Sequence, residues 1–119
     1  MAADSNDAQS FYQKGLNELQ HENWFSALVF FQKAREKNPQ DADICFRLGC
    51  CYGNLGHYQN AMESFKQAIK IKPDDIGGHF NLGLAYLGAG DKESALEEYE
   101  ILKTMDADKA NELLELISK

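Results

Sequence analysis

Residues 42–75 read ADICFRLGCCYGNLGHYQNAMESFKQAIKIKPDD, and residues 76–109 read IGGHFNLGLAYLGAGDKESALEEYEILKTMDADK. When the second stretch is written beneath the first, the same residue types recur 34 positions apart. The matching pairs are Leu48 and Leu82, Gly49 and Gly83, Tyr52 and Tyr86, Gly56 and Gly90, Ala61 and Ala95, and Phe65 and Tyr99. Self-similarity at a fixed period of this length indicates a repeat architecture, in which each copy forms one structural unit.

An earlier stretch, residues 8–41, is a weaker copy of the same unit. It reads AQSFYQKGLNELQHENWFSALVFFQKAREKNPQD. In register with the other two copies it keeps Gly15, Ala27, Phe31, Ala34 and Pro39. The three copies follow one another without insertion, so repeats account for residues 8–109.

Within each copy the apolar residues recur at helical spacing. In the second copy, Ile44, Leu48 and Tyr52 fall on one face of a first helix. A second helix is predicted from Ala61, Phe65 and Ala68, which fall on one of its faces. The turn residues NLGHY separate these two segments. Each copy therefore predicts a helical hairpin.

Turn and cap signals mark the helix ends. Gly56 and Gly90 stand where a helix commonly ends in a left-handed residue, a conformation that glycine adopts without steric cost. Asn23 and Asp91 precede the second helices of their copies, and both are residue types whose side chains cap a helix N-terminus. We expect these four residues to define the hairpin turns.

A glycine recurs in the middle of the first helix of every copy, at Gly15, Gly49 and Gly83. Glycine in a helix interior costs about 1 kcal/mol relative to alanine. Its recurrence therefore predicts that the facing helix of the hairpin packs against a bare backbone. The residues expected to form the matching close contact are Ala27, Ala61 and Ala95. The residues expected to fill the gap between neighbouring hairpins are Phe31, Phe65 and Tyr99.

A longer motif covers leucine-glycine, tyrosine, glycine, alanine, aromatic, alanine and proline. The second copy carries it as Leu48, Gly49, Tyr52, Gly56, Ala61, Phe65, Ala68 and Pro73. In this motif the chain resembles the tetratricopeptide repeat family. The resemblance implies an all-α fold, a right-handed α-solenoid of three antiparallel helix hairpins, with repeats at 8–41, 42–75 and 76–109. The outer copies depart from the motif, as terminal repeats with one face toward water commonly do.

Two segments lie outside the repeats. Residues 1–6 are expected to be a disordered tail, which leaves residues 7–119 as a single domain. The C-terminal stretch DADKANELLELISK predicts a helix over about 107–118. We expect this helix to cap the apolar flank of the third hairpin. Alternatively, it is the first helix of a truncated fourth copy that continues into a neighbouring molecule.

The resemblance also implies a binding surface, because in this family the first helix of each copy lines a concave face on which a partner peptide usually lies. The candidate peptide-binding residues at these slots are Tyr12, Gln13, Leu16, Leu19, Phe46, Arg47, Cys50, Asn54, Phe80, Asn81, Leu84 and Leu87. Further inward slots hold Gln9, Asp43 and Gly77. Three aromatic residues, Tyr12, Phe46 and Phe80, are one repeat apart and are not required by the predicted hairpin packing. An apolar groove with a few polar groups suits an extended or helical peptide.

Some members of the family bind the C-terminal tails of heat-shock chaperones and hold the terminal carboxylate with lysine, asparagine and arginine at set inner slots. The corresponding slots here hold Tyr12, Leu16, Arg47, Gly77 and Asn81. Only Arg47 and Asn81 can address a carboxylate, so this clamp is not expected. The two residues are candidates for hydrogen bonds to a peptide backbone. Alternatively, Arg47 pairs with Asp43 one helical turn earlier.

The residue types that support catalysis or metal binding are present but poorly placed. The spacing of Cys45, Cys50 and Cys51 fits neither zinc-binding pairs nor a disulfide framework. By alignment, Cys45 and Cys51 are expected to be buried and Cys50 to lie on the inner face. The three histidines fall at hairpin turns or near a helix start, away from a nucleophile or paired carboxylates. We therefore expect no enzymatic activity, no metal and no cofactor.

The charge of the chain excludes some partners. Nineteen acidic residues against twelve basic ones give a net charge of −7, which opposes binding to nucleic acid and to anionic membranes. Nine of the acidic residues, against three lysines, lie between Asp91 and Glu115. We interpret this acidic end as a solvated surface or, alternatively, as a docking patch for a basic partner. Without a run of about 20 apolar residues or a signal peptide, the chain is expected to be cytoplasmic and not to insert into a membrane.

Two functions from different classes remain. The first is a non-enzymatic protein–protein interaction module, with an adaptor, scaffold or cochaperone-like role, that binds a peptide or segment of a partner protein in its groove. The second is a self-assembling scaffold, a homo-oligomer formed through the end hairpins or the terminal helix.

Overall fold

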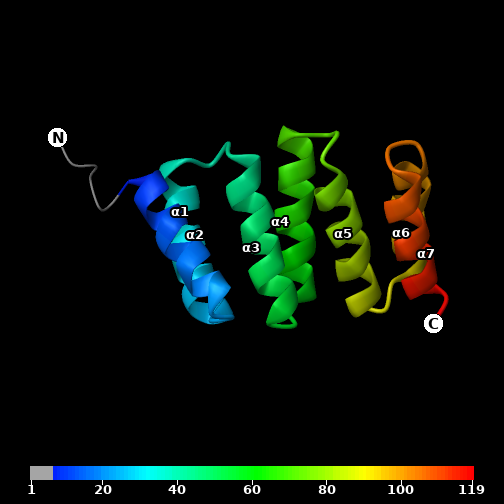
Figure 1. Ribbon diagram of the computed structural model, residues 1–119, viewed down its shortest axis with the longest axis horizontal. Helices are drawn as coiled ribbons and strands as arrows, with labels where there is room; N and C mark the ends of the chain where they lie inside the picture. The colour runs from blue at the N-terminus through cyan, green and yellow to red at the C-terminus, as the bar shows by residue number, and fades with distance from the viewer. Residues whose placement is uncertain (1–6) are drawn as a thin grey trace.

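The computed structural model describes residues 7–119, so the expected disordered tail at residues 1–6 lies outside the described residues. In this range the chain folds into seven helices, with no strand. Their bounds are α1 Ala8–Gln20, α2 Trp24–Lys37, α3 Ala42–Asn54, α4 Tyr58–Ile71, α5 Ile76–Gly88, α6 Lys92–Lys103 and α7 Ala107–Ile117. The helices form an elongated all-α solenoid of 51 × 25 × 20 Å, with α1 and α2 at one end of the long axis and α6 and α7 at the other (Figure 1).

Consecutive helices pair into hairpins, α1 with α2, α3 with α4 and α5 with α6. Each hairpin packs on the next through α2 against α3 and α4 against α5. The last helix, α7, packs against both α6 and α5. Three hairpins and a terminal helix confirm the predicted architecture. Of the helices in the described range, none is long and apolar enough to cross a membrane.

The hairpin turns repeat in conformation. Gly56 and Gly90 adopt left-handed backbone angles, with φ of +79° and +84°, as predicted. Glu22 stands at the equivalent position of the first hairpin and also has a positive φ, of 58°. A side chain disfavours this conformation. The first hairpin therefore keeps the turn geometry of the other two even where its sequence lacks the glycine.

The two predicted caps differ in outcome. Asp91 caps α6, because its carboxylate accepts from the Ser94 backbone N–H at 3.0 Å and from the Ser94 hydroxyl at 2.7 Å. These hydrogen bonds lower the pKa of Asp91. Asn23 makes no side-chain cap to α2, so that prediction is wrong. Its amide nitrogen instead donates to the Glu18 carboxylate at 2.8 Å, a charge-assisted bond that ties the turn back to α1.

The repeated glycines make room for aromatic rings. A methyl group placed at Gly15 would lie 2.6 Å from the Phe31 ring, and one at Gly49 would lie 2.5 Å from the Phe65 ring. Both rings are almost fully buried. Each ring therefore lies directly over the glycine of its own hairpin. The same rings also contact the next hairpin, because Phe31 belongs to a core cluster with Leu48 of α3 and Phe65 to one with Leu82 of α5, so they fill the gap between neighbouring hairpins as expected.

The third hairpin uses a different residue for the same contact. A methyl group at Gly83 would lie 2.7 Å from Leu113 of α7, not against Tyr99. Leu113 and Ala110 are fully buried, together with Leu102 of α6. The terminal helix therefore covers the third hairpin as predicted, and one of its leucines completes the hairpin core.

Candidate functional site

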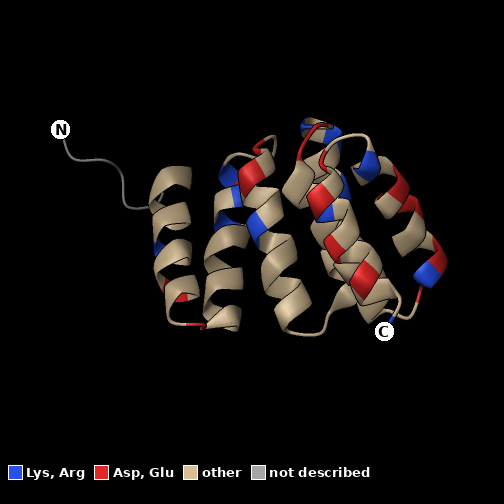
Figure 2. Ribbon diagram, turned by 45° about the vertical axis from the view of Figure 1, so that its right-hand side comes forward, with Lys and Arg blue, Asp and Glu red and all other residues tan. Residues whose placement is uncertain are grey.

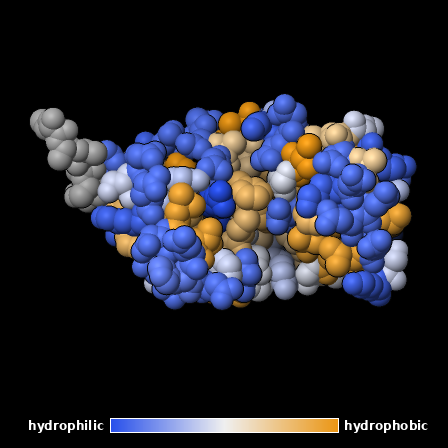
Figure 3. Space-filling model, viewed as in Figure 1, coloured by the Kyte–Doolittle hydropathy of each residue, from blue (hydrophilic) through white to orange (hydrophobic). Residues whose placement is uncertain are grey.

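The twelve candidate groove residues all lie on three helices, α1, α3 and α5. These helices follow one another along the long axis (Figure 1), and α3 contacts α5 directly. All twelve residues are half-buried or exposed. Seen from the side of Figure 1, apolar side chains gather over the middle of the molecule between hydrophilic regions (Figure 3). We call the surface formed by these twelve residues the groove face.

A polar cluster joins α1 to α3 on the groove face. The Tyr12 hydroxyl donates a hydrogen bond to the Asp43 carboxylate. Burial, and then this carboxylate, raise the pKa of Tyr12. The Nε atom of Arg47 lies 3.9 Å from the other Asp43 oxygen, a distance too long for a hydrogen bond. That Nε atom is buried and has no hydrogen-bond acceptor within residues 7–119.

All three groove aromatics pack against a core cluster, Tyr12, Phe46 and Phe80 alike. The Tyr12 and Phe31 ring centroids are 5.7 Å apart, and so are those of Phe46 and Phe65. Tilted pairs at this distance are favourable. Tyr12 and Phe46 therefore contribute contacts to the packing of their hairpins. Phe80 packs against the core cluster of α6 and α7, and the Lys109 ammonium group of α7 lies 4.7 Å from its ring centroid.

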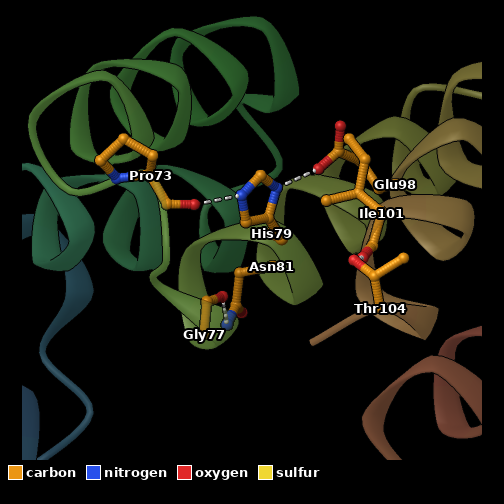
Figure 4. A network of polar contacts seen from close by, with 7 residues as sticks. All are labelled: Pro73, Gly77, His79, Asn81, Glu98, Ile101 and Thr104. Carbon is orange, nitrogen blue, oxygen red and sulfur yellow. Dashed lines mark hydrogen bonds and ion pairs between the residues drawn. The ribbon is translucent and has the colours of Figure 1, made fainter. Parts of the chain in front are cut away.

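Two asparagines of the groove face are held in place by their own helices. The amide nitrogen of Asn54 donates to the Cys50 carbonyl at 2.8 Å, and that of Asn81 donates to the Gly77 carbonyl at 2.9 Å (Figure 4). Each amide nitrogen carries two N–H groups, and each side chain also has a carbonyl oxygen. The second N–H group and the oxygen can therefore serve a bound segment without a change of rotamer.

A hollow of about 220 Å³ opens between α3 and α5 on the groove face. Its lining residues are Gly49, Cys50, Gly53, Asn54, Tyr58, Phe65, Asn81, Leu84 and Ala85. Four of these, Cys50, Asn54, Asn81 and Leu84, were predicted as groove residues. The other five, Gly49, Gly53, Tyr58, Phe65 and Ala85, were not predicted to line the groove. A signal for Gly53 was present, because the other two copies place Leu19 and Leu87 at the equivalent position.

The cysteines have the predicted placement. Cys45 and Cys51 are buried, and Cys50 is half-buried in the wall of the hollow. Burial raises the pKa of Cys50 to about 11 and that of Cys51 to about 12. All three thiols are free. Cys50 is therefore the most accessible thiol of the three, but it stays protonated at neutral pH.

We expect iodoacetamide at about pH 8 to modify Cys50 first, and about two orders of magnitude more slowly than it modifies the urea-unfolded chain. A pKa of about 11 leaves far less thiolate than the free-cysteine value of about 8.5 does. The rate should rise about tenfold per pH unit, because only the thiolate reacts. Peptide mass spectrometry over time measures the order of modification. Three equal rates, or Cys45 first, would contradict this placement.

His79 is buried, and its ring spans two elements. One ring nitrogen lies 2.9 Å from the Pro73 carbonyl oxygen, and the other lies 2.7 Å from the buried Glu98 carboxylate (Figure 4). Both neighbours are acceptors, so the ring donates to both only in its doubly protonated form. His79 therefore ties α5 to α6 and to the preceding turn, and its two nitrogens are already engaged.

The acidic end of the chain maps to α6 and α7 (Figure 2). Some of its carboxylates are paired within one helix, Glu100 with Lys103 at 2.8 Å and Glu112 with Lys109 at 3.0 Å. These pairs are partly exposed and contribute little to stability. Both interpretations of this end, solvated surface and docking patch, stay open.

Comparison with protein families gives one match. The family model described as tetratricopeptide repeat matches residues 42–75 and 76–109. These adjacent ranges cover more than half of the chain. The sequence matches no curated protein.

Solved structures resemble the fold closely. The TPR domain of Arabidopsis OM64 is 15% identical with a TM-score of 0.87, and the match covers 93% of each chain. The first TPR of Spaghetti (RPAP3), bound to the HSP90 peptide SRMEEVD, is 19% identical with a TM-score of 0.87, over 98% of this chain and 94% of that one. A mutant of MamA is 30% identical with a TM-score of 0.77, over 94% of this chain and 74% of that one. These matches agree with the hairpin arrangement described above.

Proposed function

Because the chain belongs to the tetratricopeptide repeat family, we propose that it is a non-enzymatic protein–protein interaction module whose groove face binds a segment of another protein. The observation that carries the proposal is the hollow of about 220 Å³ between α3 and α5, which apolar side chains and two asparagine amides line. The Arg47 side chain on the same face is 34% exposed, so the outer N–H groups of its guanidinium can donate to a carbonyl oxygen of a bound backbone. Asn54 and Asn81 offer their amide groups on the same face.

The proposed ligand is an internal, backbone-recognised segment. Solved domains of this fold bound to HSP90 and HSP70 peptides support a peptide as the occupant. In some members of the family, those that bind the C-terminal tails of heat-shock chaperones, a free terminal carboxylate is held by charged and amide groups at set slots. Tyr12, Leu16 and Gly77 occupy three of those slots here. Arg47 is the one charged group left at these slots, so a terminal carboxylate would gain few charge-assisted hydrogen bonds here. The asparagine amides can pair with the carbonyl and N–H groups of a peptide backbone.

The test uses a phage-displayed library of random 12-residue segments flanked by coat-protein sequence, so that no free carboxylate is offered. Affinities of selected peptides are measured by fluorescence anisotropy. The double variant Arg47→Ala/Asn81→Ala is expected to weaken binding by about 10-fold or more, because it removes hydrogen bonds from a charged group and an amide. Phe46→Ala is avoided, since Phe46 packs on Phe65.

A matched control carries the same substitutions outside the groove face. Arg35→Ala/Asn60→Ala removes an arginine and an asparagine that line a different hollow, between α2 and α4. This variant should bind the selected peptides within about twofold of the wild type. Equal weakening by both double variants, or by neither, would place the binding site elsewhere.

Size-exclusion chromatography with light scattering addresses the self-assembling alternative. A monomeric mass that does not change with protein concentration is the result expected for the interaction module. A mass that rises with concentration, and falls when the exposed Leu116 of α7 is replaced by serine, would favour assembly through the terminal helix.

A further inference from the structure

The hollow in the groove face exists where the second repeat lacks a side chain. Gly53 lies on the last turn of α3, and the equivalent residues of the other repeats are Leu19 and Leu87. Both leucines pack against the cores of their own hairpins. A methyl group placed at Gly53 would meet no atom within 4 Å. The space that a leucine fills in the first and third repeats is therefore open in the second.

Nothing in the backbone accounts for glycine at this position. Gly53 is helical and does not have the positive φ of Gly56 and Gly90. Gly49, one turn earlier, differs because the Phe65 ring lies directly over it. Glycine weakens a helix relative to alanine. Gly53 therefore lowers helix stability with no packing gain among the described residues.

The chemistry of the hollow selects its occupant. No charged side chain is among its lining residues. Leu84, Ala85 and the Phe65 ring supply apolar surface, and burial raises the pKa of the Cys50 thiol in the same wall. A charged group placed there would lose its hydration without gaining a partner. An aliphatic side chain would lose only unfavourable contact with water.

The rim of the hollow supplies groups for the backbone that would carry such a side chain. Asn54 and Asn81 stand on opposite helices, α3 and α5, and both line the hollow. Each amide is fixed by a hydrogen bond to its own helix and keeps one N–H group and one oxygen for another partner. A segment crossing between the two helices would meet both amides on either side of one inserted side chain.

We propose that the hollow is an anchor subsite that takes one leucine-sized aliphatic side chain of the bound segment. The incoming side chain replaces the leucine that the second repeat lacks and completes the core of that hairpin. This inference rests on the proposed function and adds the chemistry of the partner. The partner segment carries leucine, isoleucine or methionine at the anchor position.

The experiment compares the wild type with Gly53→Leu, in which the chain itself fills the hollow. Peptides selected from the internal 12-residue library on the wild type should share one aliphatic position. Replacing that residue by alanine should weaken binding to the wild type by about 10-fold or more, the effect of removing a buried leucine-sized side chain. The same replacement should weaken binding to Gly53→Leu by less than about threefold. The matched control Gln59→Leu adds a leucine at an exposed position of α4 and should behave as the wild type does.

The outcomes separate this inference from the proposed function. An equal loss on the wild type and on Gly53→Leu, or selected peptides without an aliphatic position, would overturn the anchor subsite while peptide binding stands. Failure to select any peptide would overturn both proposals. If Gly53→Leu does not fold by circular dichroism, Gly53→Ala replaces it. A single methyl has open space there and should reduce the effect of the peptide substitution by an intermediate amount.

Discussion

Leu113→Ala is expected to lower the free energy of unfolding by about 3 kcal/mol, within the range measured for leucine-to-alanine changes in a packed core. Leu113 is fully buried, and its methyl groups lie against the bare backbone of Gly83. Alanine cannot reach that backbone, so a cavity would open between α7 and α5. Urea unfolding followed by circular dichroism measures the loss, and the midpoint should fall at an unchanged slope.

A matched control lies on the same helix. Leu116 is 39% exposed, so Leu116→Ala removes the same atoms from a largely solvated site and should cost less than about 1 kcal/mol. If both variants lose the same small amount, α7 is not part of the cooperative unit. A reduced slope for Leu113→Ala would instead show α7 detaching before the hairpins unfold.

Much of the fold can be predicted from the sequence, because the same residue types recur at equivalent positions of more than one repeat. Apolar spacing at Ile44 and Leu48 predicts a helix, and the same spacing recurs 34 residues later. The left-handed turns at Gly56 and Gly90 follow from the chemistry of one residue type, and the structure confirms them. Predictions from local signals of this kind do not depend on which helix packs against which.

Contacts between helices were predicted less well, because spacing along one helix does not identify the partner residue. The glycines predict a close approach, but only the structure shows that Phe31 and Phe65 make it. In the third hairpin the equivalent aromatic, Tyr99, is displaced from this role by Leu113 of a helix outside the repeat. The cap at Asn23 failed for a similar reason, since the hydrogen bond that its amide nitrogen donates to Glu18 holds the side chain toward α1, and its oxygen does not accept from the N–H groups of α2.

In the candidate site, too, the sequence predicts which helices carry the residues better than it predicts the contacts of each residue. Repeat register places the candidate groove residues on the first helices of the three hairpins, and these helices follow one another along the long axis of the structure (Figure 1). Their individual contacts depend on neighbours in other helices, such as Asp43 for Tyr12 and Phe65 for Phe46. Gly53 was missed because a residue without a side chain carries no chemical signal of its own. Only comparison with Leu19 and Leu87 reveals it.

Two glycines of α3, one turn apart, are expected to respond in opposite directions to the same substitution. Gly49→Ala should destabilise the protein by about 1 kcal/mol, the net of an overpacking cost and a helix-propensity gain. The added methyl would lie 2.5 Å from the Phe65 ring, which is 2% exposed and packs against Phe46. Overpacking of a filled core typically costs about 1–3 kcal/mol, which exceeds the helix-propensity gain of about 1 kcal/mol.

Gly53→Ala should stabilise the protein by about 1 kcal/mol, because its methyl meets no atom within 4 Å and only the helix-propensity gain remains. Thermal and urea unfolding of the two variants beside the wild type measure both signs. Two stabilised variants would mean that the Phe65 ring moves away from Gly49 at little cost. A destabilised Gly53→Ala would mean that the hollow is closed in the free protein. We expect Gly49→Ala to be destabilised and Gly53→Ala to be stabilised, and also weaker binding of aliphatic peptides to Gly53→Ala. Together these results would show that Gly53 lowers the stability of the free protein and leaves space for the partner's side chain.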